Sequence, residues 1–220
     1  MITRKASAFI FLLALVLSPG LLVYAQEGDW VNAVFRGYAL GECVVIDGGD
    51  TYSGFGCISL RGVAEDLQPW FYPGGYTSED MVAMGTLVVT WIDGADQRHH
   101  LSLALYTPVP AGGWVNEGGH FAVGNIAYSG IHRFGSSLMR VNGLFSGGPY
   151  SVSPPEPLDM VYVAHLKTSD NTPLLFLVWS RTGGLLSEGS VYNGAYNVVV
   201  PEDIYLRRSM VFGFEASAYD

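Results

Sequence analysis

Apolar and polar residues alternate along most of this chain, or the apolar residues form short runs between Gly, Pro, Asn and Asp. A period of two is typical of β-strands with one buried face. Two hairpins are clearest. The first has strands at 86–92 and 99–106 around the turn signal Asp93-Gly94, and the second has strands at 160–167 and 174–180. The run at 174–179 is continuously apolar, which indicates a strand covered on both faces.

Further strands are expected at 30–38, 43–46, 55–60, 120–126, 138–141, 196–200 and 208–216. The best helix candidate, residues 77–84, opens like a capping box but is barely two turns long. We therefore predict an all-β fold, a β-sandwich of two mainly antiparallel sheets with very little helix. The Pro- and Gly-rich stretch 147–157 is expected to be a crossover loop between the two sheets within a single domain, residues 26–220, in preference to a linker between domains.

The first 25 residues have the layout of a secretory signal peptide. Arg4 and Lys5 precede an apolar run at 9–17, and small residues precede a cleavage point before Gln26. The alternative is an uncleaved membrane anchor, but the continuous apolar run is well short of the ~20 residues of a spanning helix. We expect a secreted protein that resides outside the cell or on its surface.

The composition is unusual in its small number of charged residues. Asp, Glu, Lys and Arg make up 14% of the chain, against about 25% in average globular proteins. The formal net charge of −9 excludes the basic footprint of a nucleic-acid-binding protein. Because so few charges are available to cover the surface, apolar area is expected in contacts with other molecules, which favours assembly or adhesion.

The only two cysteines, Cys43 and Cys57, enclose two aspartates, four glycines and two aromatic residues in the stretch CVVIDGGDTYSGFGC. A hairpin folded about Asp50, with a loop at 47–53, would place the two cysteines opposite each other. An exported protein would then retain a disulfide between them. Asp47 and Asp50 are also a calcium candidate, although Asp and Gly are equally what a tight turn requires. No other cofactor is expected.

A second loop exposes aromatic residues between prolines and glycines. Trp70, Phe71, Tyr72 and Tyr76 could stack on sugar rings or contact a protein partner, or could fold back on the core.

Catalytic and metal motifs are missing from the sequence. It contains no G-x-S-x-G nucleophile elbow and no phosphate-binding loop. His99 and His100 are neighbours on a predicted strand, so they should point to opposite faces and cannot bind one metal together. We therefore expect a protein that is not an enzyme.

Three functions remain open. The first is a structural subunit of an extracellular filament, sheath or matrix that associates with identical subunits, and the second is a carbohydrate- or ligand-binding module. The third and least favoured is an outer-membrane β-barrel, because runs such as 174–178 do not alternate as a polar channel requires. For the first, the N-terminal segment is a candidate donor strand for a neighbour's sheet. Its residues are Trp30, Val31, Val34, Phe35 and Tyr38.

Overall fold

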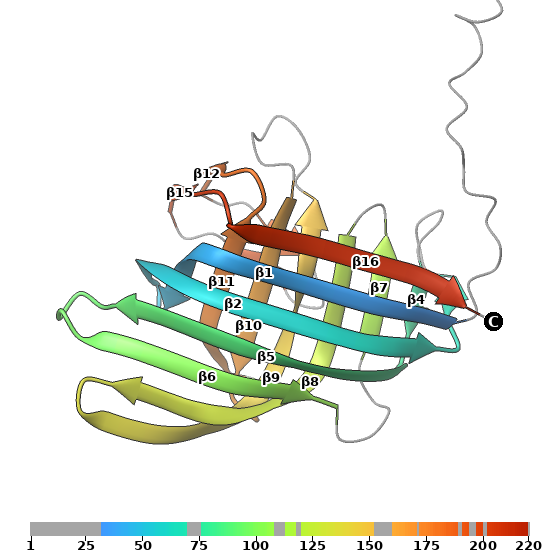
Figure 1. Ribbon diagram of the computed structural model, residues 1–220, viewed down its shortest axis with the longest axis horizontal. Helices are drawn as coiled ribbons and strands as arrows, with labels where there is room; N and C mark the ends of the chain where they lie inside the picture. Colours follow the sequence, from blue (N-terminus) through green and yellow to red (C-terminus); the bar gives the residue numbers. More distant parts are fainter. Residues whose placement is uncertain are drawn as a thin grey trace, which may run out of the picture.

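The computed structural model describes residues 32–69, 76–107, 113–117, 120–151, 160–170, 172–188, 191–193, 197–199 and 202–219. Every regular element in these ranges is a β-strand, and none of them is helical (Figure 1). The described residues thus include no helix with the length and apolar character needed to cross a membrane. The expected signal peptide, residues 1–25, lies outside them.

Eight antiparallel strands form a closed barrel. Along the chain each strand pairs with the next, and the last pairs with the first, because β11 bonds to β1 and β8 bonds to both β6 and β9. The strands are β1 (Asn32–Asp47), β2 (Asp50–Glu65), β5 (Asp80–Ile92), β6 (Arg98–Tyr106), β8 (His120–Phe134), β9 (Ser137–Ser151), β10 (Met160–Lys167) and β11 (Pro173–Ser180). The predicted β-sandwich is therefore wrong, since one sheet curls until its two ends pair.

The barrel interior is filled with side chains. Trp179 on β11 and Tyr162 on β10 are fully buried there, with their rings edge to face at 6.4 Å. Trp179 Nε1 donates a hydrogen bond to the carbonyl oxygen of Gly56, 3.2 Å away on β2. An eight-stranded barrel is just narrow enough for its own side chains to fill it. The main apolar core is thus inside the wall.

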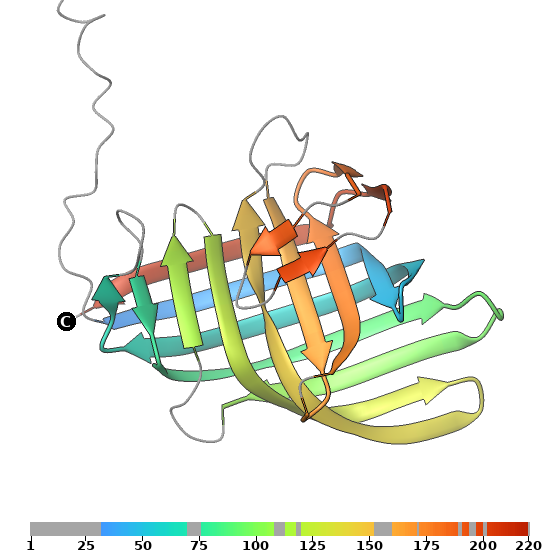
Figure 2. The same cartoon turned by 180° about the vertical axis from the view of Figure 1, so that it is seen from behind.

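Additional strands extend the sheet beyond the barrel. β16 (Val211–Tyr219) pairs with the first half of β1, whereas β11 pairs with the last four residues of that strand. At the other side β7 (Gly113–Glu117) pairs with the beginning of β8 and is followed outward by β4 (Tyr76–Ser78) and β3 (Gln68–Pro69). In Figures 1 and 2 the strands β16, β1, β2, β5 and β6 form one side of the molecule and β7, β10 and β11 form the other, while β8 and β9 bend from one side to the other.

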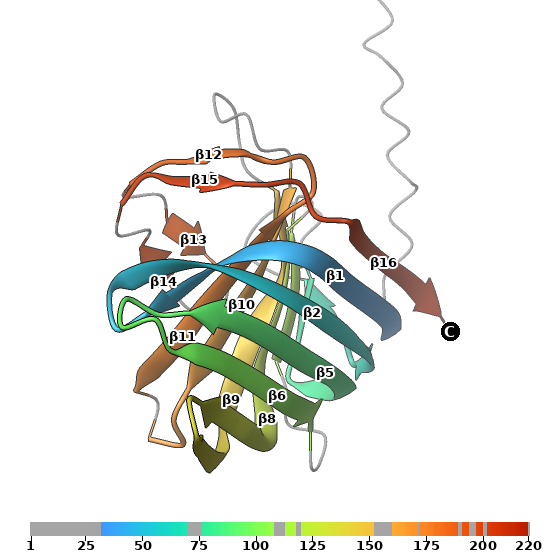
Figure 3. The ribbon, with the colours of Figure 1, turned by 60° about the vertical axis from the view of Figure 1, so that its left-hand side comes forward.

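A second apolar cluster lies outside the wall. β12 (Gly184–Leu186) pairs with β15 (Ile204–Leu206), and this small sheet lies over the barrel (Figure 3). Its apolar side chains pack against outward residues of β1, β10 and β11: Val44, Val161, Val163, Phe176 and Val178. The odd-numbered residues Leu175, Leu177 and Trp179 face the interior. The prediction of a strand covered on both faces is confirmed. Another two-stranded sheet pairs β13 (Val191–Asn193) with β14 (Asn197–Val199).

Two glycines in strand interiors mark places where the wall curves. A Cβ built on Gly85 would lie 2.2 Å from the carbonyl oxygen of Ser59, and one on Gly130 would lie 2.0 Å from that of Ser102. Each contact is with backbone of the neighbouring strand, so it cannot be relieved by a side-chain rotation. Glycine within a strand commonly marks such a bend at a barrel corner.

The strand predictions succeed where the alternation is regular. Both predicted hairpins exist, as β5–β6 and β10–β11. The predicted helix at 77–84 is wrong, because the strand β5 begins at Asp80. Buried and exposed side chains alternate from the start of this strand, with Met81 buried and Val82 exposed. The predicted crossover loop is wrong over 147–151, where β9 continues and pairs with β10. Residues 152–159 lie outside the described ranges.

The Gly130→Ala variant should lower the free energy of unfolding by about 1–3 kcal/mol, because its methyl group would overlap the Ser102 carbonyl. The measurement is urea unfolding followed by tryptophan fluorescence. Gly94→Ala is the control, since nothing lies within 4 Å of a Cβ at that turn position. Equal stability of the Gly130 variant and wild type would contradict the bend.

Candidate functional site

Three hairpins meet at one end of the barrel, where a polar cluster of the interior lies close to a groove of the outer surface. The hairpins are β1–β2, β5–β6 and β8–β9. Inside the wall lies a histidine cluster, defined as Asp93, His99 and His132. Outside it lies a groove whose floor is the outer face of β2 and β5.

Asp93 follows β5 and organises the β5–β6 turn. Its Oδ1 accepts hydrogen bonds from the backbone N–H groups of Ala95 (2.9 Å) and Gln97 (2.8 Å). Its Oδ2 lies 3.0 Å from Nε2 of His99. The hydrogen bond with His99 is the main reason that the pKa of this carboxyl lies below its usual value, followed by the bond from Gln97. All these contacts favour the carboxylate form.

His99 is 8% exposed and faces the interior from β6. Its Nδ1 lies 3.0 Å from Nε2 of His132 on β8. Aromatic rings enclose it: Trp91 stacks on it at 4.5 Å between centroids, and Phe134 stacks at 5.7 Å. The prediction that His99 and His100 point to opposite faces is confirmed, because burial alternates along β6, with His99 buried and His100 only partly buried.

The hydrogen-bond network assigns the protons of the cluster. A carboxylate only accepts, so with both rings neutral His99 carries its proton on Nε2, and its Nδ1 then accepts the proton of His132 Nε2. Burial first, and then the neighbouring His99, lower the pKa of His132, while Asp47 raises it. Both nitrogens of His99 are therefore used within the cluster, and Nδ1 of His132 is the remaining ring nitrogen. The arrangement joins the β5–β6 turn to β8.

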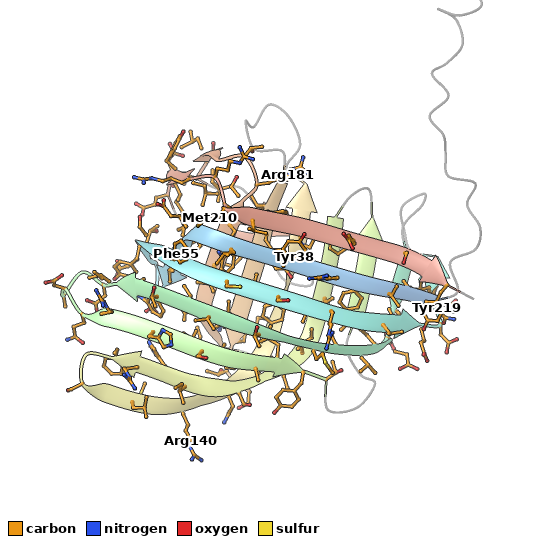
Figure 4. The ribbon with its side chains drawn as sticks, viewed as in Figure 1. Tyr38, Phe55, Arg140, Arg181, Met210 and Tyr219 are labelled. Carbon is orange, nitrogen blue, oxygen red and sulfur yellow. The ribbon has the colours of Figure 1, made fainter. Side chains whose placement is uncertain are left out.

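The groove has a volume of about 650 Å³, within the range of about 300–1,000 Å³ that is common for small-molecule sites. Phe55, Thr90 and Ile92 form its floor, and the chain from Tyr205 to Arg207 forms one wall. Other lining residues come from β1, β2, β5, β6 and β15: Glu42, Cys43, Val44, Ser53, Gly54, Trp91, Arg98 and Leu206. Phe55 is labelled in Figure 4, which shows this side of the molecule.

Ionic groups lie on the wall of the groove and at its far edge. Arg207 meets Glu42 through two contacts, Nε to Oε2 at 3.2 Å and Nη1 to Oε1 at 3.3 Å. Arg98 lies across the floor, directly opposite Ile92 in the β5–β6 pairing. The groove thus combines two guanidinium groups and one carboxylate with apolar surface, since Phe55 and Ile92 are each nearly half exposed.

The predicted pairing of Cys43 with Cys57 has the wrong register. The chain turns on Gly48 and Gly49, both with positive φ (62° and 101°), so Cys43 lies opposite Gly54 and Cys57 lies opposite Leu40. A shift of three residues reverses the face on which a side chain lies. Cys43 is buried in the interior, Cys57 is on the outer face, and both are free thiols in the structure. The disulfide expected from the earlier register is therefore not formed.

The calcium candidates Asp47 and Asp50 are directly opposite each other at the ends of β1 and β2, beside the Gly48–Gly49 turn. Tyr52 donates a hydrogen bond to Asp50 Oδ2 at 3.4 Å. In the part of the chain that the structure describes, no group of three or more His, Cys, Asp or Glu side chains could surround a metal ion. Calcium binding here stays a prediction.

The remaining predicted site residues fall in two places. Trp70, Phe71 and Tyr72 lie outside the described residues, and Tyr76 begins β4. Of the donor-strand residues, Trp30 and Val31 also lie outside. The others, Val34, Phe35 and Tyr38, belong to β1, which pairs with β2 on one side and β16 on the other within its own chain. In this arrangement the segment completes its own sheet.

The chain was compared with protein-family models, curated proteins and solved structures, and it matches none of them.

The structure predicts two free thiols. Denatured protein, purified without reductant, should react with two equivalents of a thiol reagent, because Cys43 and Cys57 lie on opposite faces of the sheet. In the folded protein Cys57 should react first, since burial raises the pKa of the Cys43 thiol to about 12. The measurement is mass spectrometry after alkylation, with a reduced sample as the control. A mass two hydrogens below that of the reduced chain would show a disulfide instead.

A second buried histidine makes stability depend on pH. His165 on β10 lies edge-on to Phe176, and burial, together with Lys167, lowers its pKa to about 4. The unfolded chain takes up this proton near pH 6.5 and the folded chain does not. The contribution of neutral His165 to the stability of the fold is therefore complete above pH 6.5 and is lost as the pH falls toward 4. From the difference between these two pKa values, protonation of His165 should lower the free energy of unfolding of the wild type by about 3 kcal/mol between pH 7 and pH 4. His165→Leu should abolish this part of the pH dependence.

The measurement for His165 is the free energy of unfolding of wild type and variant at pH 7 and pH 4. His100→Leu on the outer strand face is the matched control. If both variants keep the full pH dependence, His165 is not its source.

Proposed function

We propose that this protein is an exported, non-catalytic binding protein and that its groove takes a saccharide. The carrying observation is the lining of the groove, in which exposed aromatic and aliphatic side chains adjoin a bidentate ion pair. Sugar rings have apolar faces that pack on aromatic side chains, and hydroxyl groups around their edges that need donors and acceptors. Export is part of the proposal and is supported by the N-terminal residue pattern.

The apolar contacts would come from Phe55 on the floor and Tyr205 on the wall. Phe55 is 46% exposed and Tyr205 is 74% exposed, so each has area to cover. Leu206, next to Tyr205, is buried in the outer cluster and fixes the wall to the barrel. A flat ligand between wall and floor would therefore meet a rigid support on both sides, which reduces the entropy lost on binding.

The polar contacts would come from the Glu42–Arg207 pair and from Arg98. As an exposed pair, Glu42 and Arg207 contribute little to folding stability. Their carboxylate oxygens and guanidinium N–H groups can instead accept from and donate to neighbouring hydroxyls. Arg98 adds a second positive charge, so the groove has a net charge of +1 in a protein of net charge −9. We therefore expect acidic sugars to be preferred over neutral ones.

The distribution of side chains favours this proposal over the outer-membrane alternative. The interior core is apolar, whereas Arg36, Arg61 and Arg140 lie exposed outside it. A barrel that spans lipid around a polar channel has the reverse arrangement.

Titration calorimetry with an oligogalacturonate and a neutral glucose oligomer of equal length tests the proposal. We expect the acidic oligomer to bind more tightly, and Tyr205→Ala to weaken it by about tenfold, the loss of roughly one stacking contact. Arg98→Gln should remove the preference for the acidic oligomer. Tyr219→Ala, a tyrosine at the far end of β16, is the matched control (Figure 4). Binding of neither oligomer, or binding unchanged by Tyr205→Ala, would refute the saccharide groove.

A further inference from the structure

A broad part of the outer face has no charged side chain. Two neighbouring rows of outward positions cross six strands, from β16 through β1, β2, β5 and β6 to β8, in direct cross-strand register. We call these rows the uncharged face. Its residues are Gly213, Tyr38, Ser59, Thr86, Ala104 and Ser129 in one row, and Val211, Leu40, Cys57, Val88, Ser102 and Ile131 in the other.

The uncharged face is partly apolar. A Cβ on Gly213 would lie 2.4 Å from the ring of Tyr38, which shows that this ring lies down over the neighbouring strand. The guanidinium of Arg36 lies 5.3 Å from the centre of the same ring. Val88 and Ile131 are more than a third exposed, and Val211 nearly half. Figure 4 shows Tyr38 on this side of the molecule.

From this pattern we infer that the uncharged face binds the same face of a second copy, with the two-fold axis running across the strands between the two rows. Such an axis places each strand over its equivalent and exchanges the rows. Tyr38 then meets Leu40 of the second copy, and Thr86 meets its Val88. This inference does not depend on the saccharide groove.

The rows flanking the uncharged face support identical copies as partners. The row on one side includes Glu215, Arg36 and Arg61, and the row on the other side includes Glu42, Phe55 and Arg133. The same axis brings Arg36 of one copy onto Glu42 of the other, which already contacts Arg207 of its own chain, and it brings Arg61 onto Phe55. The first is an ion pair and the second a cation–π contact, and each occurs twice in the dimer. A face that complements itself in this way is the mark of a two-fold interface.

The available area agrees with a stable dimer. One outward position occupies about 33 Å², from a strand spacing of about 4.8 Å and a two-residue repeat of about 6.8 Å. Four rows on the five strands β16, β1, β2, β5 and β6 then offer about 650 Å², within the range of about 600–1,000 Å² that each partner buries in an interface of standard size. The two central rows alone would offer about half of that, so the charged flanking rows belong to the interface.

Sedimentation velocity of the purified protein without saccharide tests the dimer, because Phe55 belongs to both the groove and the flanking row. We expect wild type to sediment as a dimer. Val88→Arg should raise the dimer dissociation constant by about a hundredfold or more, because it buries unpaired charge twice. Val82→Arg is the matched control. It is an exposed valine on the same strand and face but beyond the four rows, and it should leave the dimer intact.

A charge exchange and a thiol measurement distinguish this interface from any other. Arg36→Glu and Glu42→Arg should each weaken the dimer, and the double variant should restore it, because the two residues meet across the axis. Alkylation of Cys57 should slow as the protein concentration rises, and this protection should vanish in Val88→Arg. A monomer at all concentrations, a dimer that survives Val88→Arg, or equal loss in Val82→Arg would overturn the inference. Glu42 and Phe55 also line the groove, so the dimer covers part of it, and saccharide binding is measured separately on the monomeric Val88→Arg variant.

Discussion

Closure of the barrel rests on four residue pairs between the end of β1 and the middle of β11. Val44 to Asp47 pair with Val178 to Leu175, and they join the first strand of the meander to the last. Without this contact the sheet would have two open edges and its apolar inner face would be exposed along one side. With it, Trp179 and Tyr162 become fully buried. The β1–β11 contact therefore converts a curled sheet into a filled core.

The same contact determines what lies outside the wall. Because β1 pairs with β11 only at its end, its first half is free to pair with β16. The outward residues at the junction, among them Val44 and Val178, then need a cover, and the β12–β15 sheet supplies it. The edge of that cover is the wall of the groove. Groove, outer cluster and the broad outer face are thus consequences of where β1 divides its hydrogen bonds between two partners.

The sequence was sufficient to locate strands whose apolar residues repeat regularly. It failed to predict the architecture, which depends on pairing between strands that are distant in the sequence. Alternation or short apolar runs identified β5, β6, β10 and β11, but the choice between a sandwich and a barrel depends on which sheet edges pair with each other. Gly85 and Gly130 were available signals, because glycine inside a strand indicates a bend. Similarly, Gly48-Gly49 is a recognised two-residue turn, and reading it as one would have put the two cysteines on opposite faces.

The candidate site was mostly beyond reach of the sequence. His99 and His132 are 33 residues apart and Asp93 belongs to a turn, so nothing in their spacing indicates that they meet. The groove is formed by β2 and β5 together with β15, whose residues lie more than a hundred positions later. What could be predicted was the local rule that His99 and His100 face opposite ways. Contacts between distant segments follow from the closure of the barrel and from the register of its strands.

Amide hydrogen exchange along β1 and β11 tests the closure most directly. If the barrel is closed, the amides that bond between the two strands at residues 44–47 and 175–178 should exchange only through global unfolding, as slowly as those between β2 and β5. Fast exchange at these residues, with the other strand pairs protected, would show an open sheet and would contradict the account.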